Sequence, residues 1–450
     1  MNRRHFLTGS AATAGLMLAR PGRAAVSAAD RKFVFVFAQG GWDPTRVFAT
    51  EFANPNVDME PQGALRTEGG VTFVDHPARP SVGAFLEQHH ARTLVLNGVL
   101  VRSIAHEICT MIAMTGDSSG LLPDWPARLA TLGAIPTTVP HLVLGGPSFP
   151  GPNGAAVART GGAGQLEALL SGAIRDWTDA PTPALPRATE QLVDDFVLRR
   201  AEAASGRVTG GNGKGLVDAY ARATRSAADL EDLRYTMDFT VGATLLDQIP
   251  VAVEALEIGL SRCVTLSAGT DWDSHDNNDP TQSANFERTF SGLARLLETL
   301  RATPGNTPSA TLMEETIVVV MSEMGRTPRL NGFAGKDHWT YTSWMLVGDG
   351  ITGDRVVGAY DDLYYGLGVD PGSADARTDQ HMCCPPVVLV MYEATFKKIS
   401  SFFTQTIWNW WMVSITNPIH DSVYIVTLKP RLLANKRRTA SDYKNVQRHA

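Results

Sequence analysis

The sequence predicts an α/β fold with a mostly parallel sheet covered by helices on both faces. Short apolar runs rich in β-branched residues have the length of buried strands, and segments with apolar residues at i, i+3 and i+4 lie between them. Apolar strands that alternate with helices are typical of such sheets. With 450 residues, 44% of them hydrophobic and 19% charged, the chain can bury a large core.

The expected elements follow one another along the whole first part of the chain. Strands are expected at 32–37 (KFVFVF), 93–98 (TLVLNG), 141–146 (HLVLGG), 263–268 (CVTLSA), 316–321 (TIVVVM) and 341–350 (YTSWMLVGDG). One helix is expected from about Ser103 and another over 284–302. The segment 187–260 has helical periodicity throughout, so it is expected to be a helical insertion.

The first residues, 1–28, have the pattern of an export signal. Arg3 and Arg4 precede a mild apolar stretch, and small residues provide a cleavage point near Val26. The pattern resembles a twin-arginine signal, which predicts the twin-arginine translocase as a partner and a periplasmic or secreted location. The alternative interpretation is an amphipathic first helix of the fold.

Charge, hydropathy and cysteine content exclude several classes of protein. The net charge of -6 and the pI of about 6.0 give no indication of nucleic-acid binding. No later apolar run reaches the roughly 18 residues that a membrane span needs, so no transmembrane segment is expected. Cys109, Cys263, Cys383 and Cys384 fit neither a disulfide framework nor a CxxC zinc site.

The end of the chain differs in composition from the rest. The last glycine is Gly372, and lysine is rare before residue 383 but frequent after it. We therefore expect one α/β domain over 29–380 and an atypical tail over 381–450. The tail is interpreted as a frameshifted or fused segment, with a genuine accessory tail as the alternative.

Four loops that follow expected strands carry residues of the kind that bind metals. They contribute Asp43 in GGWD, Ser103 and His106 in RSIAH, Asp271, Asp273 and His275 in DWDSH, and Glu323, Asp337 and His338 in the loop 322–339. Ligands of open parallel sheets bind beyond the carboxyl ends of the strands, so these loops are expected to converge. Carboxylates mixed with imidazoles suit one or two divalent ions, namely Zn, Mn, Mg or Ca. Taken singly, each residue also fits a turn or a surface ion pair.

Three stretches carry a resemblance to a known family. GGWD, VTLSAGTDWDSHDN and above all the stretch 316–362 resemble domain-of-unknown-function family 1501, DUF1501, and the resemblance spans about 30–370. That family is exported and belongs to the alkaline phosphatase/sulfatase-like superfamily. The resemblance implies a three-layer α/β/α sandwich, alkaline phosphatase-like, with a bimetal site at the strand ends.

The resemblance also implies roles for particular residues. The implied metal ligands are Asp43 in a bridging position, Asp273 with His275 for one ion, Glu323 as an acidic ligand and His338 as the last histidine. Asp271 is an alternative to Asp273. Met324 stands where a histidine ligand is usual, which puts one of the two metal positions in question.

The implied nucleophile position is occupied unusually. The position that the resemblance implies for the nucleophile, counted back from Thr115 and Gly116, is occupied by His106. Ser103 lies one turn earlier and Thr110 one turn later. His106 is interpreted as an extra ligand, a general base or a phosphoryl acceptor. Sulfatase chemistry of the usual kind is not expected, because CCPPV lacks the arginine of the sulfatase motif.

The function expected from these patterns is an exported metal-dependent hydrolase of a phosphate or related ester. Its substrate would be a small molecule or a glycan phosphoester. Ser103 and His106 are the candidate catalytic groups, and Arg326 is expected either to clamp an anionic substrate or to pair with a nearby acid. The alternative is a non-catalytic metal- or ligand-binding envelope protein on a degenerate phosphatase/sulfatase fold.

Overall fold

The structure is a computed structural model of the chain. It describes residues 26–160, 186–208, 210–233, 237, 239, 241–307, 309, 311–369 and 376–381. The twin-arginine pair lies outside the described residues, and so does the predicted tail after His381. All the described residues belong to one compact unit, Met1–Lys397.

An eight-stranded sheet forms the centre of this unit. In spatial order its strands are β12 (Arg355–Val357), β4 (Thr93–Leu100), β11 (Tyr341–Gly348), β8 (Thr316–Ser322), β1 (Lys32–Ala38), β7 (Cys263–Ser267), β5 (His141–Val143) and β6 (Val157–Arg159). Strand β1 pairs in parallel with both β7 and β8, whereas β11 runs antiparallel to both of its neighbours. The predicted α/β fold with a mostly parallel sheet is therefore confirmed.

The central strand β1 shows why the apolar runs become strands. Its residues Phe33, Val34, Phe35, Val36 and Phe37 are all buried, with exposed fractions of 0–1%. Side chains on both faces of the strand are covered, so both must be apolar. Each such side chain contributes about 1.5–3 kcal/mol through burial.

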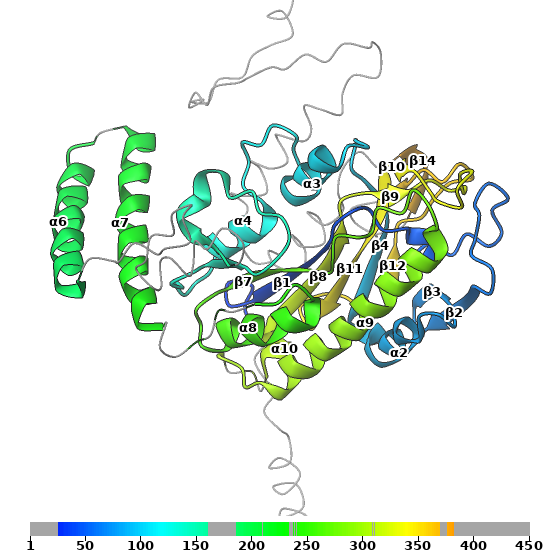
Figure 1. The fold of residues 1–450 in the computed structure, drawn as a ribbon, viewed down its shortest axis with the longest axis horizontal. Helices are drawn as coiled ribbons and strands as arrows, with labels where there is room; N and C mark the ends of the chain where they lie inside the picture. The colour runs from blue at the N-terminus through cyan, green and yellow to red at the C-terminus, as the bar shows by residue number, and fades with distance from the viewer. Residues whose placement is uncertain are drawn as a thin grey trace, which may run out of the picture. The chain divides into compact units, whose positions relative to one another are not determined.

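Helices cover both faces of the sheet. Figure 1 shows α2 (Pro80–His89), α8 (Leu245–Glu257), α9 (Asn278–Ala302) and α10 (Leu312–Glu315) on one side, and α3 (His106–Thr115) and α4 (Trp125–Thr131) on the other. Along α9, the residues Phe286, Phe290, Leu293 and Leu297 recur at helical spacing and are fully buried. The arrangement has the three layers that the sequence predicts.

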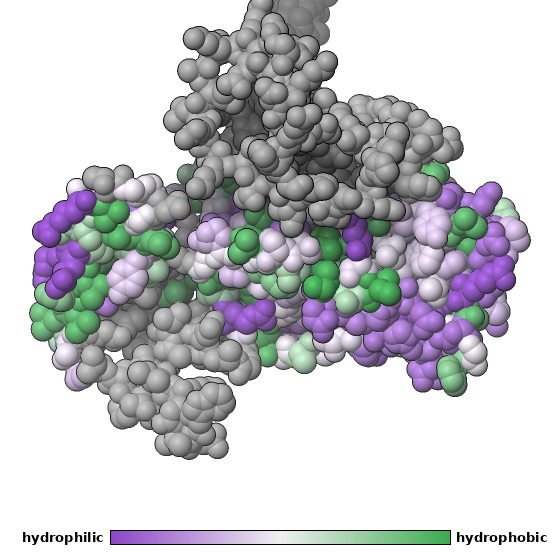
Figure 2. All heavy atoms as spheres, turned by 90° about the horizontal axis from the view of Figure 1, so that it is seen from above, coloured by the Kyte–Doolittle hydropathy of each residue, from purple (hydrophilic) through white to green (hydrophobic). Residues whose placement is uncertain are grey.

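The predicted helical insertion contains two different parts. The helices α6 (Arg187–Ser205) and α7 (Gly211–Leu233) pack on each other, whereas α8 packs on α9 and β7. Over α6 and α7, Figure 2 shows hydrophobic residues beside strongly hydrophilic ones at the surface. Leu192, Phe196, Leu216 and Tyr220 are each more than half exposed there. Helix α8 is therefore part of the core layer, and only α6 and α7 form a projecting pair.

Several features differ from the expected elements. Strand β11 is antiparallel because the segment that joins it to β8 contains no helix to cross over the sheet. Helix α9 begins at Asn278, six residues before the predicted start at 284, and β5 ends at Val143 rather than at 146. The remaining short strands are β2 (Ala64–Glu68), β3 (Val71–Asp75), β9 (Gly325–Arg326), β10 (His338–Trp339), β13 (Leu367–Val369) and β14 (Ala376–His381), and the short helices are η1 (Pro44–Arg46), η2 (His90–Arg92) and η3 (Gly151–Ala156).

Within the described residues, no helix combines the length and the apolar character that crossing a membrane requires.

Candidate metal centre

The loops after β1, β7 and β8 meet at the carboxyl ends of these parallel strands, as the sequence predicts. The turn after β1 permits this approach because Gly40 and Gly41 have φ values of 122° and 80°. A Cβ on Gly40 would lie 2.7 Å from the backbone nitrogen of Asp273. Glycine at this position therefore lets the β1 loop lie directly against the β7 loop.

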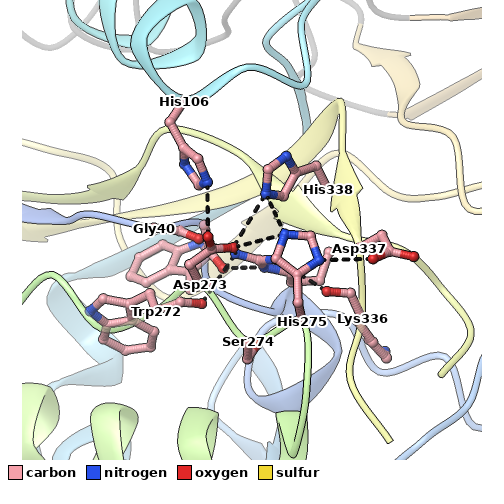
Figure 3. Close-up of polar contacts among 12 residues, drawn as sticks. Gly40, His106, Trp272, Asp273, Ser274, His275, Lys336, Asp337 and His338 are labelled. Atoms are coloured by element: carbon pink, nitrogen blue, oxygen red, sulfur yellow. Dashed lines mark hydrogen bonds and ion pairs between the residues drawn. The ribbon is translucent and has the colours of Figure 1, made fainter. Parts of the chain in front are cut away.

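Three histidines and one aspartate converge at this edge of the sheet (Figure 3). Ligand atoms of His106, Asp273 and His338 all lie within 4.8 Å of one another. The Nε2 atoms of His275 and His338 are each 3.2 Å from Oδ1 of Asp273, and Nε2 of His106 is 3.3 Å from its Oδ2. The two nitrogens Nε2 of His275 and His338 lie 2.9 Å apart. We call these four residues the His/Asp cluster.

The opposite nitrogen of each ring faces an acceptor. Nδ1 of His106 lies 2.9 Å from Oε1 of Glu323, Nδ1 of His275 lies 2.8 Å from Oδ1 of Asp337, and Nδ1 of His338 lies 2.6 Å from the carbonyl oxygen of Ile104. Carboxylates and carbonyls accept hydrogen bonds, so a ring that carries its proton on Nδ1 satisfies each of these contacts. Each neutral ring then has its lone pair on Nε2.

The His/Asp cluster therefore brings Nε2 of three rings to one carboxylate, whose Oδ1 also accepts a hydrogen bond from Arg326. With the proton of each ring on Nδ1, the Nε2 lone pairs of His275 and His338 point at each other and at the carboxylate of Asp273. Such an arrangement is repulsive unless a cation, either a metal ion or protons, lies among these atoms. Imidazole nitrogens whose Nδ1 donates to a carboxylate or carbonyl are the usual ligands of Zn²⁺ and similar ions. His106, Asp273 and His338 fit one divalent ion, and His275 contacts two of them, Asp273 and His338, from outside this mutually close group.

Electrostatics and exposure suit this interpretation. The hydrogen bond from His106 to Glu323 raises the pKa of the imidazole, although its partial burial opposes the shift. Burial would raise the pKa of Asp273, but the hydrogen bond and charge of Arg326 outweigh it and the pKa is lowered. The side chain of Asp273 is 42% exposed and that of His275 is 47% exposed. The carboxylate of Asp273 is therefore charged and, like the ring of His275, partly open to solvent.

A protein-family model matches part of the chain. Residues 251–374 match the family model of DUF1501, described as a protein of unknown function. The resemblance to DUF1501 is confirmed over this stretch, which contains Asp273, His275 and His338 but not His106. No curated protein matches the chain.

Two solved structures give weak matches. One is a Vibrio parahaemolyticus protein in the alkaline phosphatase superfamily, with 10% identity and a TM-score of 0.29 over 75% of this chain and 65% of that chain. The other is a Pyrococcus horikoshii protein, with 12% identity and a TM-score of 0.24 over 75% of this chain and 88% of that chain. The chain thus spans just under two thirds of the length of the Vibrio protein.

Glu323, in the DUF1501 stretch, lies behind His106 rather than among the convergent Nε2 atoms. Its carboxylate is fully buried, and Oε1 accepts from the N–H of Gly40 at 2.7 Å as well as from His106. Its Oε2 accepts from the hydroxyl of Ser322 at 3.1 Å. The structure thus gives Glu323 the position of a residue that orients His106, whereas the sequence predicts a metal ligand.

Asp43, the expected bridging ligand, is engaged by protein donors. Its Oδ1 accepts from the N–H and hydroxyl of Thr45, and its Oδ2 accepts from Asn278 at 2.9 Å and from Lys336 at 2.9 Å. Burial would raise the pKa of Asp43, but the charges of Lys336 and Arg46 outweigh it and the pKa lies below its usual range. Among the described residues, Asp43 does not join the metal-type group of His106, Asp273 and His338.

Arg326 forms an ion pair, which is one of the two roles that the sequence left open. Its side chain is fully buried, and Nη2 lies 2.6 Å from Oδ1 of Asp273. Its other donors reach backbone carbonyls, including that of Gly41 at 2.8 Å. With these partners the buried guanidinium acts as the ion-pair partner of Asp273, and the expected anion clamp stays a prediction.

Two more residues of the sequence analysis lie beside the cluster without entering it. The hydroxyl of Ser103 accepts from the N–H of Ala105 at 3.2 Å, in the turn that leads into α3. Met324 is fully buried in an apolar group with Val101 and Cys109. The position where a further histidine ligand was implied is therefore part of the core.

Sequence reasoning missed Lys336 and Asn278, which hold Asp43, and it gave no role to Asp337 beyond membership of the loop. One signal for Lys336 was present. Only three lysines precede residue 383, and Lys336 is the one that stands beside the Asp-His pair of the loop. Asn278 had no such signal, because it lies at the start of a helix that was expected to begin later.

Proposed function

We propose that this protein is a metal-dependent hydrolase of a phosphate or related ester, with one divalent ion held by His106, Asp273, His275 and His338. The observation that supports it best is the convergence of three Nε2 atoms on one carboxylate. The exposure of Asp273 and His275 supports a substrate site rather than a closed structural one.

The residues around the ion have separate tasks in this proposal. Glu323, Asp337 and the carbonyl of Ile104 hold the proton of each ring on Nδ1, so that all three rings present Nε2 together. A bound divalent ion supplies Lewis acidity toward an ester oxygen and toward an attacking water. His106 is the first residue of α3, and its Nε2 faces the carboxylate of Asp273. We therefore assign His106 to the ligand set and assign the attack on the ester to water.

The start of α3 supports an anionic substrate. The residue before the helix is Ala105, and within the described residues it makes no side-chain capping bond. The first N–H groups of α3 therefore add partial positive charge next to His106. A phosphate or sulfate group that approaches the ion from this side would gain hydrogen bonds from the helix.

We propose one ion rather than two. A second ion would need the carboxylate of Asp43, but both of its oxygens accept hydrogen bonds from Thr45, Asn278 and Lys336. The ammonium group of Lys336 supplies the positive charge that a second metal ion would otherwise supply.

Export through the twin-arginine translocase to the periplasm or medium remains part of the proposal. It depends on Arg3 and Arg4, which lie outside the described residues. The proposed substrate is a small molecule or a glycan phosphoester.

The proposal can be tested by metal analysis and an activity panel. Purified protein is expected to contain about one divalent ion per chain and to hydrolyse at least one of a set of aryl phosphate monoesters, diesters and sulfates. His338→Ala is expected to lose both the ion and the activity. His90→Ala is the control, because His90 also pairs with an aspartate, Asp354, and has similar exposure, but lies outside the cluster. Metal-free, inactive wild-type protein would sink the proposal.

The second candidate function is a non-catalytic metal-binding protein. Its support is that the first residue of α3 is His106 instead of a residue with a hydroxyl, and that Ser103 is engaged with the backbone of Ala105. The same experiment separates the two functions, because this candidate predicts bound metal with no turnover of any substrate in the panel.

A further inference from the structure

We propose that Arg326 is a positioning residue that sets the metal affinity of the His/Asp cluster by holding Asp273 and the loops around it in register. The inference rests on the metal site proposed above. It assigns to Arg326 a task that neither the family match nor the ligand set contains.

Arg326 donates hydrogen bonds to three separate segments. Its acceptors are Oδ1 of Asp273 at 2.6 Å, the carbonyl of Trp272 at 3.3 Å, the carbonyls of Gly40 and of Gly41, the latter at 2.8 Å, and the carbonyl of Lys336 at 3.1 Å. These acceptors belong to the loop after β1, the loop after β7 and the segment just before β10. In Figure 3, Gly40, Trp272, Asp273 and Lys336 lie below His106 and His338.

The backbone of Arg326 is tied to the cluster as well. In the two-stranded ladder of β9 and β10, Arg326 pairs with His338. A single residue therefore connects His338 through its backbone and Asp273 through its side chain. The distance between these two ligands depends directly on its position.

The hydrogen bond from Arg326 to Asp273 lies among the proposed metal ligands. Oδ1 of Asp273 receives Arg326 and is also 3.2 Å from Nε2 of both His275 and His338. A carboxylate without this partner can rotate about its terminal bond, and its side chain is 42% exposed. The buried guanidinium removes this freedom before any ion arrives.

Lysine cannot replace arginine here. The planar guanidinium has five N–H donors in a fixed fork, whereas an ammonium has three donors at one point on a flexible stem. Lysine at position 326 would keep the charge but would lose most of the carbonyls that Arg326 joins.

The chain offers a matched control in Arg262. This side chain is also buried, and it donates to backbone carbonyls of two separate segments, at Ala28 and Arg31 before β1 and at Leu129 in α4. It bonds to no member of the His/Asp cluster in the described contacts. Arg262→Lys therefore removes a comparable set of bonds without touching the site.

The experiment measures Zn²⁺ affinity by competition with a chromophoric chelator, for wild type, Arg326→Lys, Arg326→Gln and Arg262→Lys. Both Arg326 variants are expected to bind Zn²⁺ about 10- to 100-fold more weakly than wild type, as for other residues that orient metal ligands. Arg262→Lys is expected to bind as wild type does, although its Tm falls too. The visible spectrum of the Co²⁺-loaded protein is expected to change in Arg326→Lys and not in Arg262→Lys.

Each other result overturns the inference in a distinguishable way. If wild type binds no Zn²⁺ or Co²⁺, the proposed function fails together with the inference. If wild type binds and the Arg326 variants bind as tightly as Arg262→Lys, the metal site stands and the role of Arg326 is wrong. If both Arg326 variants are unfolded by far-UV circular dichroism while Arg262→Lys is folded, Arg326 is required for folding, and the positioning role is rejected.

Discussion

Two carboxylates at the same edge of the sheet have opposite surroundings. Asp43 follows β1 and is fully buried, with the cations Lys336 and Arg46 beside it. Asp273 follows β7, is partly exposed, and faces the rings of three histidines. Both residues fit the pattern of a metal ligand in the sequence, but only Asp273 lies among other side chains of the metal-binding type.

The difference lies in the balance of donors and acceptors. Every acceptor position that Asp43 uses is matched by a hydrogen from Thr45, Asn278 or Lys336, so its negative charge is neutralised within the protein. Around Asp273, Arg326 is a donor, but the three ring nitrogens that face it belong to imidazoles whose Nδ1 already meets an acceptor. A surplus of acceptors, rather than a group of acidic residues, is what indicates a cation site.

The largest effect is expected when the charge balance at Asp43 is broken. Lys336→Met leaves a buried carboxylate without its main counter-charge and is expected to lower the free energy of unfolding by about 3–5 kcal/mol. Urea denaturation of the metal-free protein measures the loss. The double variant Asp43→Asn with Lys336→Met should recover part of it, because the unpaired charge is then absent. If Lys336→Met is as stable as wild type, the charge of Lys336 is not needed to balance the buried carboxylate of Asp43.

A smaller effect is expected from a partner of the His/Asp cluster. Asp337→Ala removes the acceptor that holds the proton of His275 on Nδ1 and is expected to weaken Zn²⁺ binding about tenfold, or roughly 1.4 kcal/mol. Chelator competition measures the affinity. Asp354→Ala is the control, since it removes the equivalent acceptor from His90 outside the cluster. Equal affinities in the two variants would contradict the ligand role of His275.

The smallest expected effect is a difference in pH dependence between the His/Asp cluster and Asp43. Glu323 raises the pKa of His106 above its usual 6.5, so protons compete with the metal from above that pH and affinity should fall between about pH 8 and 5. The pKa of Asp43 is lowered from 3.8, so its contribution to stability is complete above that value and is lost only in stronger acid.

The corresponding measurement has two parts. Zn²⁺ affinity is followed over this pH range, and the difference in unfolding free energy between wild type and Asp43→Asn is followed without metal from about pH 7 to 5. The affinity should decline and the difference should stay constant. A difference that declines in parallel would mean that Asp43 titrates in the same range, against the direction of its pKa shift.

Much of the fold could be predicted because burial restricts a segment to apolar residues, which are visible in the sequence. The run TIVVVM became β8 and the run KFVFVF became β1, since strands covered on both faces must be apolar throughout. The direction of β11 could not be predicted, because an apolar pattern is the same for a parallel and an antiparallel strand. The start of α9 at Asn278 was missed because its first two turns are largely polar.

The sequence by itself determined that Asp43, His106, Asp273 and His338 would lie at one edge of a mostly parallel sheet, since each is placed after a strand or at the start of a helix that follows one. Only the tertiary structure decided that Asp43 is enclosed by Thr45, Asn278 and Lys336, whereas Asp273 faces three histidines. Lys336 reaches Asp43 from a distant part of the chain, and Arg326 reaches Asp273 in the same way. The neutralisation of a charge depends on distances through space, and residue order does not record them.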